Sequence, residues 1–523
     1  MTPPPLSGRP PVGLREAWLW AATFLVAAAG LTYELIAATL SSYLLGDSVR
    51  QFSLVIGVYL AAMGLGAWLS RFVGDALQGF VWAQIFLGVI GGFMAPVLFF
   101  SYGATGAVEL PLYLMLISVG ALAGLELPLI ARILKAIGLP EFRFENVLSL
   151  DYVGALAASL AFPVLIVPHL GLMSASLVFG CLNLGVAGLS LWLFREAATR
   201  LACLVWALAL ALSLAALYGA EKMVSVAEAN LFEDEVILSQ ASPYQHITLT
   251  RFRDRIRLFL DNSIQFDSQD EYRYHESLVH PAMALAPRRE NILILGGGDG
   301  LAAREVFLYP EVRSVTLVDL DAAVTTLFAS HPDLAALNNQ ALSDPRLKVV
   351  SLDAWKFLET ATGSYDVIIA DLPDPKSIAL SKLYSREFYG VLVEHLSAQG
   401  LLVVQSGSPL FARQGFWSVV HTLAATRNPL RPEPSTNRAG LAVIPYHVYI
   451  PSFGDWGFTI ASFRPLTPRP LRLPAGLRYL TGAIWQQQQV FGLDSADMAA
   501  EINSIGSHAL VGYYNQGWDL WFR

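Results

Sequence analysis

Acidic residues follow a series of apolar runs in the second half of the chain, and their positions indicate a ligand site. The stretch ILILGGGDG, residues 292–300, joins an apolar run to a glycine-rich turn that carries Asp299. Later apolar runs end in further acids, which are Asp319 with Asp321, Asp353, and Asp371 with Asp374. Open α/β sheets bind ligands outside the carboxyl ends of their strands, so we expect these acids to lie together.

Asp299 limits the charge of the ligand that the glycine turn can hold. Asp319 lies nineteen residues beyond Gly300, close to the spacing of about 20 at which an acid binds ribose hydroxyls. A dinucleotide pyrophosphate needs helix N-terminal amides free of negative charge, and Asp299 supplies negative charge. It would also repel the carboxylate of S-adenosylmethionine. Decarboxylated S-adenosylmethionine ends in an ammonium that Asp299 can bind, so the turn favours aminopropyl transfer.

The elements that position these acids follow an αβ alternation. The runs NILILG, VRSVTLVDLD, RLKVVSLDA and YDVIIADLPDP are predicted strands, and a helix is predicted after the glycine turn. Earlier, EVILSQ, QHITLTRF and IRLFLDNSIQF alternate as in an antiparallel sheet. We therefore predict a small antiparallel β domain at 223–285 and a Rossmann-like, doubly wound catalytic domain at 286–462. Residues 463–523 are predicted to be a proline-rich linker and a tail that packs on the catalytic domain.

Residues 1–222 have the composition of a membrane domain. They hold ten Lys or Arg and eleven Asp or Glu, whereas the other 301 residues hold fifty-five charged side chains. Seven apolar stretches are long enough to cross about 30 Å of hydrocarbon: 17–39, 53–74, 79–101, 109–132, 147–170, 172–196 and 200–219. We expect a multi-pass helical domain in a cell membrane, with a bacterial inner membrane as the expected location.

Loop charges predict the orientation of this domain. Eight basic residues fall on one side and only Arg50 in the opposite loops; the eight are Arg9, Arg15, Arg71, Arg132, Lys135, Arg143, Arg195 and Arg200. Because Lys and Arg favour the cytoplasmic side, the N-terminus is predicted inside. Seven crossings then place the C-terminal half outside, where a metabolic co-substrate is not expected. Two alternatives stay open: one segment is re-entrant or miscounted, or the C-terminal half faces the periplasm.

Three acids lie within the predicted spans. Glu34, Glu126 and Asp151 interrupt apolar sequence, and carboxylates at such positions usually face a bundle interior, a partner or a cation. One interpretation is that neighbouring spans hydrogen-bond them. The alternative is a cation site within the bundle.

Composition excludes several other classes of protein. The net charge of −8 leaves no basic stripe for nucleic acid. The two cysteines, Cys181 and Cys203, lie in apolar segments and indicate neither a disulfide framework nor a metal site.

Several motifs together resemble those of the spermidine synthase (polyamine aminopropyltransferase) family. They are ILILGGGDG, VTLVDLD, YDVIIADLPDP, LYSREFY, SPYQHI, LFLDNSIQF and DEYRYHESLVHP, within about 232 to 462. The whole architecture resembles the membrane-fused branch of that family. The resemblance implies transfer of the aminopropyl group of decarboxylated S-adenosylmethionine, as co-substrate, to putrescine or a related amine. It also implies release of 5'-methylthioadenosine and no prosthetic group, with a homodimer among the expected assemblies.

The resemblance also implies roles for individual residues. Contacts to the cofactor are expected from Gln245, Asp299, Asp319, Asp353 and Ala354. The amines are expected to meet His275, Asp299, Asp371 and Asp374, with Asp371 as the catalytic acid or base. Gln265 and Tyr274 match positions lining the amine channel, and Tyr449 matches a tyrosine near the acceptor with the spacing shifted by one. The family usually has Glu at Asp319, Gly at Ala354, and small or hydroxyl-bearing residues at Leu372 and Pro373.

Two other functions stay open. One is an S-adenosylmethionine-dependent methyltransferase, against which Asp299 and the paired acids of DLPDP argue. The other is a polyamine transporter or sensor whose C-terminal domain binds ligand without catalysis, which the acids of the predicted spans and Leu372 favour.

Overall fold

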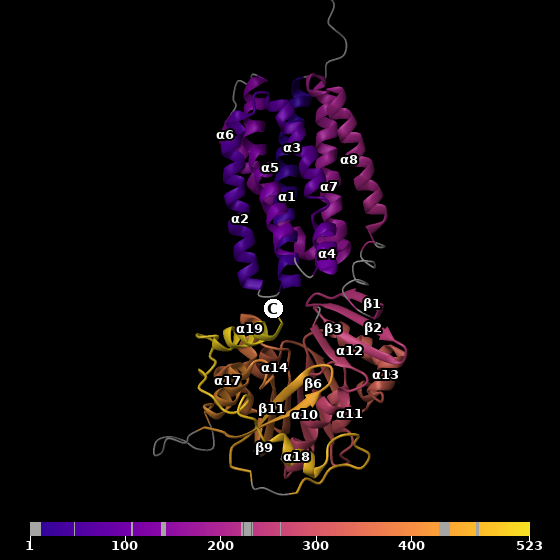
Figure 1. Ribbon diagram of the computed structural model, residues 1–523, viewed down its shortest axis with the longest axis vertical. Helices are drawn as coiled ribbons and strands as arrows, with labels where there is room; N and C mark the ends of the chain where they lie inside the picture. Colours follow the sequence, from indigo (N-terminus) through magenta and orange to yellow (C-terminus); the bar gives the residue numbers. More distant parts are fainter. Residues whose placement is uncertain are drawn as a thin grey trace, which may run out of the picture. The chain divides into compact units, whose positions relative to one another are not determined.

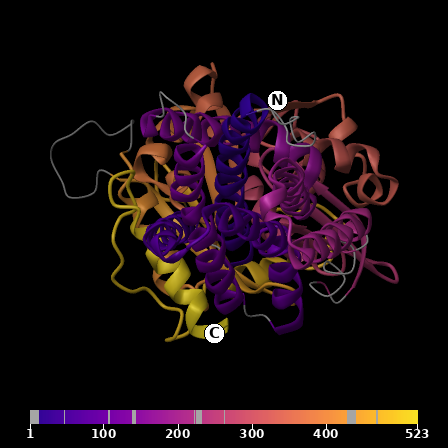
Figure 2. The same ribbon diagram turned by 90° about the horizontal axis from the view of Figure 1, so that it is seen from above.

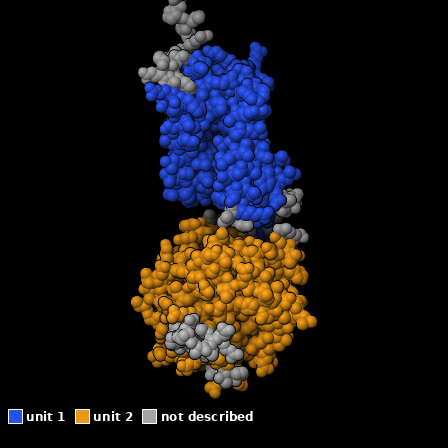
Figure 3. Space-filling view, turned by 90° about the vertical axis from the view of Figure 1, so that its left-hand side faces the viewer, with its two compact units in different colours: residues 1–236 blue, residues 237–523 orange. Residues whose placement is uncertain are grey.

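The computed structural model of the 523-residue chain divides into two compact units, Met1–Val236 and Ile237–Arg523 (Figure 3). The residues that the structure describes are 12–45, 48–105, 108–137, 143–220, 223, 232, 234–261, 263–427, 440–466 and 470–522. Arg9, the predicted domain boundary at 222 and residues 467–469 of the predicted linker lie outside these ranges. Each unit is described by itself.

The first unit is built from long apolar helices that run side by side (Figure 1), and Figure 2 looks along their axes. They are α1 (Val12–Leu45), α2 (Ser48–Leu69), α3 (Ala76–Ile90), α4 (Met94–Thr105), α5 (Glu109–Ala136), α6 (Phe144–Ala161), α7 (Val167–Leu193) and α8 (Arg200–Tyr218). Small residues bring some of them close. A Cβ added at Gly120 of α5 would lie 2.8 Å from the Ala62 methyl of α2, so glycine permits this approach.

Six helical segments among the described residues are long and apolar enough to cross a membrane. One of them, Phe144–Leu193, has 50 residues and would be about 75 Å long if straight, more than twice the hydrocarbon thickness of about 30 Å. Gly171 breaks it with a φ of 67° and a ψ of 172°. This segment therefore contains both predicted stretches 147–170 and 172–196, one on each side of Gly171, which is why seven predicted stretches correspond to six helical segments.

A four-stranded sheet comes first in the C-terminal part of the chain. Its strands, in the order β1-β2-β3-β4, are β1 (Glu235–Ala241), β2 (His246–Phe252), β3 (Arg255–Leu260) and β4 (Ser263–Asp267). β3 pairs antiparallel with β2 and with β4. The alternation in the sequence buries Ile247, Leu249, Leu258 and Phe266 on one face. The small antiparallel sheet expected from the sequence is present.

A seven-stranded sheet follows, with the order β10-β11-β9-β8-β5-β6-β7. The strands are β5 (Asn291–Gly296), β6 (Ser314–Asp319), β7 (Leu347–Ser351), β8 (Tyr365–Asp371), β9 (Leu396–Gly407), β10 (Ala442–Ile450) and β11 (Gly454–Ser462). β5 to β9 pair in parallel, whereas β11 pairs antiparallel with β9 and with β10. This confirms the predicted Rossmann-type α/β fold of the C-terminal half.

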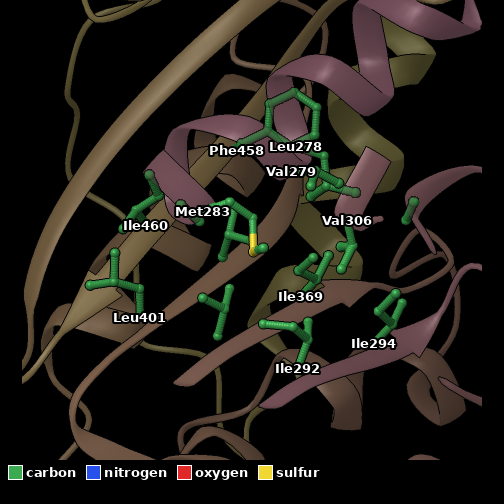
Figure 4. Close-up of a cluster of buried hydrophobic side chains, with 14 of the residues drawn as sticks. Leu278, Val279, Met283, Ile292, Ile294, Val306, Ile369, Leu401, Phe458 and Ile460 are labelled. Atoms are coloured by element: carbon green, nitrogen blue, oxygen red, sulfur yellow. The ribbon is translucent and has the colours of Figure 1, made fainter. Parts of the chain in front are cut away.

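Helices cover both faces of the seven-stranded sheet, which is why its central strands are continuous apolar runs. The helices of this part of the chain are α10 (Glu271–Leu285), α11 (Leu301–Val306), α12 (Ala322–Ser330), α13 (Pro332–Leu337), α14 (Ala354–Thr360), α15 (Ile378–Ser381), α16 (Arg386–Glu394), α17 (Arg413–Ala424), α18 (Gly482–Gln488) and α19 (Ala509–Phe522). Among them, α12 and α13 pack with the small sheet and α19 packs on α17. Figure 4 shows one buried apolar cluster, in which Leu278, Val279 and Met283 of α10 lie over Ile292, Ile294 and Ile369 of the sheet. The rigid sheet and α10 together position the site described below.

Candidate active site

The glycine-rich turn after β5 has a backbone that favours glycine. Gly296, Gly297 and Gly300 have φ values of 79°, 63° and 76°, in the left-handed region that other residues rarely adopt. The amide of Gly298 donates a 3.0 Å hydrogen bond to Oδ2 of Asp319, and a Cβ at Gly298 would lie 2.6 Å from that oxygen. The glycine turn therefore packs directly against Asp319 at the end of β6, and a side chain at position 298 would collide with it.

Strand register brings Asp371 to this turn. Gly296 of β5 pairs with Asp371, the last residue of β8, so both lie at the carboxyl edge of the sheet. A Cβ at Gly297 would lie 3.4 Å from Oδ2 of Asp371. The acids that the sequence placed at the ends of different strands thus meet around one turn, at the edge where such sheets bind ligands.

Helix α10 contributes Tyr274 and His275 to the same place. The hydroxyl of Tyr274 donates a 2.6 Å hydrogen bond to Oδ1 of Asp371. Burial raises the pKa of Asp371, while the nearby His275 and the Tyr274 hydrogen bond oppose this rise. Burial also raises the pKa of Asp299, to about 6, with His275 acting against it and Asp371 adding to it. Asp299, Asp371 and His275 therefore form one electrostatically linked group.

A buried ion pair keeps His275 in its charged form. Burial disfavours that charge. However, Nδ1 of His275 lies 2.8 Å from Oε2 of Glu271. This contact, together with the negative charges of the nearby Asp299 and Asp371, raises the pKa of His275 to about 9. Arg304 of α11 donates bonds of 2.9 Å to both carboxylate oxygens of Glu271. Two cations therefore share Glu271, which holds a positive imidazolium beside the two site acids.

Asp374 lies in the loop after β8 with both carboxylate oxygens occupied. Nε2 of Gln405 donates to its Oδ1 at 2.9 Å, and the hydroxyl of Tyr514 donates to its Oδ2 at 2.6 Å. Leu372 is buried in the core, 6% exposed, and its carbonyl accepts from Tyr384 and Gln405. The unusual Leu372 is thus a core residue, and the loop around it is held by Tyr384 and Gln405.

Sequence reasoning did not identify Gln405, Tyr514, Glu271 or Arg304 as site residues. Glu271 stands in the quoted stretch DEYRYHESLVHP, four residues before His275, a spacing that puts both on one helix face. Tyr514 belongs to the C-terminal tail, where the number of aromatic residues was the only indication of a structural role. Gln405 lies near the carboxyl end of β9, which is the same kind of position as those of the predicted acids.

Residues expected to hold the adenosine part lie at the ends of β6 and β7. Oδ1 of Asp319 accepts from the amide of Asp321 at 2.8 Å, and burial raises the pKa of Asp319. Gln245, in the loop between β1 and β2, donates to Oδ2 of Asp321 at 2.9 Å. The small sheet is thereby joined to the end of β6 through Gln245 and Asp321.

Asp353 and Ala354 stand at the start of α14. Oδ1 of Asp353 caps the helix by accepting from the amides of Trp355 and Lys356, and its Oδ2 lies 3.1 Å from Nζ of Lys382. These contacts outweigh partial burial, which acts in the opposite direction, and lower the pKa of Asp353. Ala354 is buried in the first turn. Asp353 therefore remains ionised under neutral conditions.

The two remaining predicted positions differ in their surroundings. Gln265 of β4 is partly buried and donates to the carbonyl of Ser263 at 3.3 Å. Tyr449 of β10 is 61% exposed, and its carbonyl accepts from Arg273 at 3.1 Å. No hydrogen bond within the described ranges joins the Tyr449 side chain to Asp371 or Asp374.

The acids of the predicted spans belong to the helical unit, Met1–Val236. Glu126 of α5 is 5% exposed and accepts a hydrogen bond from Gln84 of α3. This contact agrees with the interpretation in which neighbouring helices hydrogen-bond the acid. Glu34 and Asp151 are partly buried. Within the part of the chain that the structure describes, no group of three or more His, Cys, Asp or Glu is arranged to hold a metal ion.

Comparison with known proteins defines the class. Residues 271–466, which contain Asp299, Asp371 and Asp374, match the spermine/spermidine synthase domain. The polyamine aminopropyltransferase of Leptospira interrogans is 40% identical over 508 residues, with 96% of this chain and 98% of that protein covered. The chain therefore belongs to the polyamine aminopropyltransferase family.

Other relatives and a solved structure have related names. Polyamine aminopropyltransferase 1 of Ralstonia nicotianae is 41% identical over 538 residues, covering 99% of both chains. The polyamine aminopropyltransferase of Oceanobacillus iheyensis is 38% identical over 505 residues, covering 95% of this chain and 96% of that protein. The crystal structure of spermidine synthase in complex with the transition state analogue AdoDATO is 24% identical, with a TM-score of 0.44, and covers 49% of this chain and 85% of that chain.

Proposed function

We propose that this chain transfers the aminopropyl group of decarboxylated S-adenosylmethionine to a primary amine, putrescine or a related amine, and releases 5'-methylthioadenosine. The single observation that carries the proposal is the register of Gly296 with Asp371, which sets a partly buried acid against an adenosine-type glycine turn. Asp299 in that turn adds a second acid. A co-substrate and an acceptor that both carry ammonium groups suit such a site, whereas a phosphate or carboxylate does not.

The reaction is an in-line displacement at carbon. The acceptor nitrogen attacks the methylene next to the sulfonium, a C–N bond forms, and the C–S bond breaks with its electron pair moving to sulfur. The product leaves as neutral 5'-methylthioadenosine, and the new secondary ammonium keeps the positive charge. Because the acceptor amine has a pKa near that of lysine, about 10.4, it arrives protonated and must first lose a proton.

Asp371 is the group suited to accept that proton. Burial raises its pKa toward the range in which a carboxylate acts as a base. The Tyr274 hydroxyl holds Oδ1 of Asp371, and Oδ2 lies toward Gly297 of the glycine turn. Holding the amine in line with the sulfonium contributes at least as much as basicity to such reactions.

The other acids bind charge without reacting. Asp299 is suited to pair with the ammonium of the aminopropyl group and Asp374 with the far ammonium of the acceptor. The charged His275 limits the repulsion between Asp299 and Asp371. At the adenosine end, Asp319 is suited to the ribose hydroxyls, while Gln245, Asp353 and Ala354 complete the side that the family resemblance assigns to methylthioadenosine.

A direct assay tests the proposal. Purified full-length protein is incubated with putrescine and either decarboxylated S-adenosylmethionine or S-adenosylmethionine. We expect 5'-methylthioadenosine only with the decarboxylated compound, and a methylated product would overturn the proposal. Asp371→Asn should lower kcat by about 10²–10⁴-fold, as loss of a proton acceptor does, with 5'-methylthioadenosine binding retained. If the wild type binds both ligands without turnover, the chain is a sensor or transporter. The exposed Asp333→Asn, whose partner is Arg251, serves as the matched control.

We also propose that the first unit is a multi-pass domain of the cell membrane. The six long apolar segments found among its described residues support this, and so does the break at Gly171, which divides the longest segment into two membrane-length parts. Seven crossings put the two ends of the chain on opposite sides. The test labels single cysteines, introduced near each end into a chain lacking Cys181 and Cys203, with a membrane-impermeant maleimide in intact cells. Labelling of one end only is expected, and equal labelling of both ends would contradict seven crossings.

A further inference from the structure

Helix α19 brings Tyr514 to Asp374 from outside the segment that matches the family domain. That match ends at residue 466, whereas α19 spans Ala509–Phe522. The Tyr514 hydroxyl donates to Oδ2 of Asp374 at 2.6 Å. In the next position of the helix, Nδ2 of Asn515 donates to the carbonyl of Lys376 at 3.4 Å. Two successive residues of α19 thus contact the loop after β8 that carries Asp374.

The tail is firmly seated on the C-terminal unit. Leu510 is 1% exposed, and Trp518 and Trp521 lie with ring centroids 5.1 and 5.4 Å from Phe411. Gly517 allows close approach, because a Cβ there would lie 2.6 Å from Cα of Ala412 and 2.7 Å from the carbonyl oxygen of Phe411. These contacts fix where Tyr514 lies along the loop.

Aromatic rings connect the two tyrosines that hold the paired acids. Tyr274 donates to Asp371, and Tyr514 donates to Asp374. Between these two rings lie Phe453, Trp456 and Trp518, in that order. The successive ring centroids, from Tyr274 to Tyr514, are 6.2, 5.7, 6.3 and 6.0 Å apart. Aromatic faces attract ammonium groups and pack against methylenes. Asp371 and Asp374, which stand three residues apart in the chain, are thus each held by a tyrosine at one end of this series of rings.

The exposed Tyr449 and the buried Tyr514 suggest which tyrosine serves the acceptor. The family resemblance places a tyrosine near the acceptor and aligns it with Tyr449, with the spacing shifted by one. The side chain of Tyr449 is 61% exposed, whereas Tyr514 is 7% exposed and bonded to Asp374. Burial and the Asp374 carboxylate raise the pKa of the Tyr514 phenol well above its usual range, so it stays a hydrogen-bond donor.

We propose that Tyr514 of the C-terminal helix is a positioning residue of the acceptor site, which fixes Asp374 so that it selects the length of the diamine. The inference rests on the proposed function, because Asp374 has an ammonium to bind only if the chain takes an amine acceptor. Gln405 holds the other oxygen of Asp374. With both oxygens held, the carboxylate stays at a defined distance from Asp371, and that distance sets which diamine fits.

The test compares Tyr514→Phe with the wild type in full-length protein, using 1,3-diaminopropane, putrescine and cadaverine as acceptors. Loss of a hydrogen bond to a charged group should raise the KM of the preferred diamine by about tenfold or more. The KM of decarboxylated S-adenosylmethionine and kcat should change little. The differences in KM among the three diamines should become smaller. A general structural defect would not produce this separation.

Two further variants sharpen the test. Tyr513→Phe is the matched control, because within the described ranges its hydroxyl has no hydrogen bond; it should behave as the wild type. Gly517→Ala keeps Tyr514 but forces α19 away from Phe411 and Ala412, so it should raise the diamine KM as Tyr514→Phe does. If Tyr514→Phe has wild-type diamine KM values and preference, the inference is overturned and the proposed function stands.

Calorimetry separates failure of this inference from failure of the proposed function. Putrescine is titrated into wild type and Tyr514→Phe in the presence of 5'-methylthioadenosine, so the readout does not need turnover. Weaker binding of putrescine by the variant supports the role of Tyr514, even if the wild type makes no product. Absence of product in the wild type overturns only the proposed transfer reaction. Equal binding by both proteins overturns the inference whatever the assay of activity shows.

Discussion

The hydroxyl of Tyr274 lies 2.6 Å from Oδ1 of Asp371 and donates a hydrogen bond to it, which joins α10 to the carboxyl end of β8. The two residues are 97 positions apart in the chain. Burial raises the pKa of Asp371, and this hydrogen bond acts in the opposite direction together with the positive charge of His275. The proton affinity of the proposed base is therefore a balance between burial and two adjacent residues of one helix.

Removing the Tyr274 hydroxyl should move this balance. In Tyr274→Phe, Asp371 loses a donor that stabilises its charged form, so its pKa rises further and the ionised base is populated only at higher pH. The acidic limb of the pH profile of kcat/KM should shift upward. Tyr272→Phe, on the same helix with Arg478 over its ring, is the control. A profile unchanged in Tyr274→Phe would show that Asp371 is not the group that titrates.

Binding of the co-substrate should depend on the ionisation of Asp299. Its pKa is raised to about 6, so it is charged at pH 7.5 and becomes neutral as the pH falls through about 6. The Kd of decarboxylated S-adenosylmethionine should therefore rise below pH 6, by about tenfold per pH unit once Asp299 is mostly protonated. Binding of 5'-methylthioadenosine, which lacks the ammonium, should stay constant over this range. Parallel pH dependence of both ligands would refute the assignment.

The ion pair behind the site should be visible in thermal stability. The pKa of His275 is raised to about 9 by Glu271 and the site acids, so the charged imidazolium contributes stability fully below its unfolded pKa of about 6.5. That contribution is lost as the pH rises through about 9. Glu271→Gln should consequently lower Tm more at pH 6 than at pH 10. An equal loss at both values would mean that His275 is not charged, and NMR titration of His275 in the variant should show a lower pKa.

Leu372 should act through the core and not through substrate. It is 6% exposed, so Leu372→Ser, which introduces a residue closer to the usual family pattern, should destabilise the chain by roughly 2–4 kcal/mol. Leu308→Ser, at a position 44% exposed, should change stability by less than about 0.5 kcal/mol. Denaturation of both variants, with the KM of putrescine measured below Tm, checks this. An altered KM with unchanged stability would place Leu372 at the acceptor.

Short-range patterns in the sequence were sufficient to predict much of the fold. Apolar runs of strand length that end in acids predicted the parallel sheet, and its strand edges hold Asp319 and Asp371 as expected. An unbroken apolar run predicts a central strand because a strand that is buried on both faces needs apolar residues at successive positions. The helical unit follows the same rule. The separate predicted stretches 147–170 and 172–196 correspond to the two parts of Phe144–Leu193, which meet at the non-helical backbone of Gly171.

The sequence by itself determined the chemical type of the site. Asp299 among the glycines, and the pair Asp371 and Asp374, indicate a ligand with ammonium groups through charge alone, which is a property of residue type. Only the tertiary structure decided which groups control those acids. Tyr514 reaches Asp374 across 140 residues, and Arg304 reaches Glu271 across 33. Contacts between distant segments depend on how whole elements pack, and no local spacing records them.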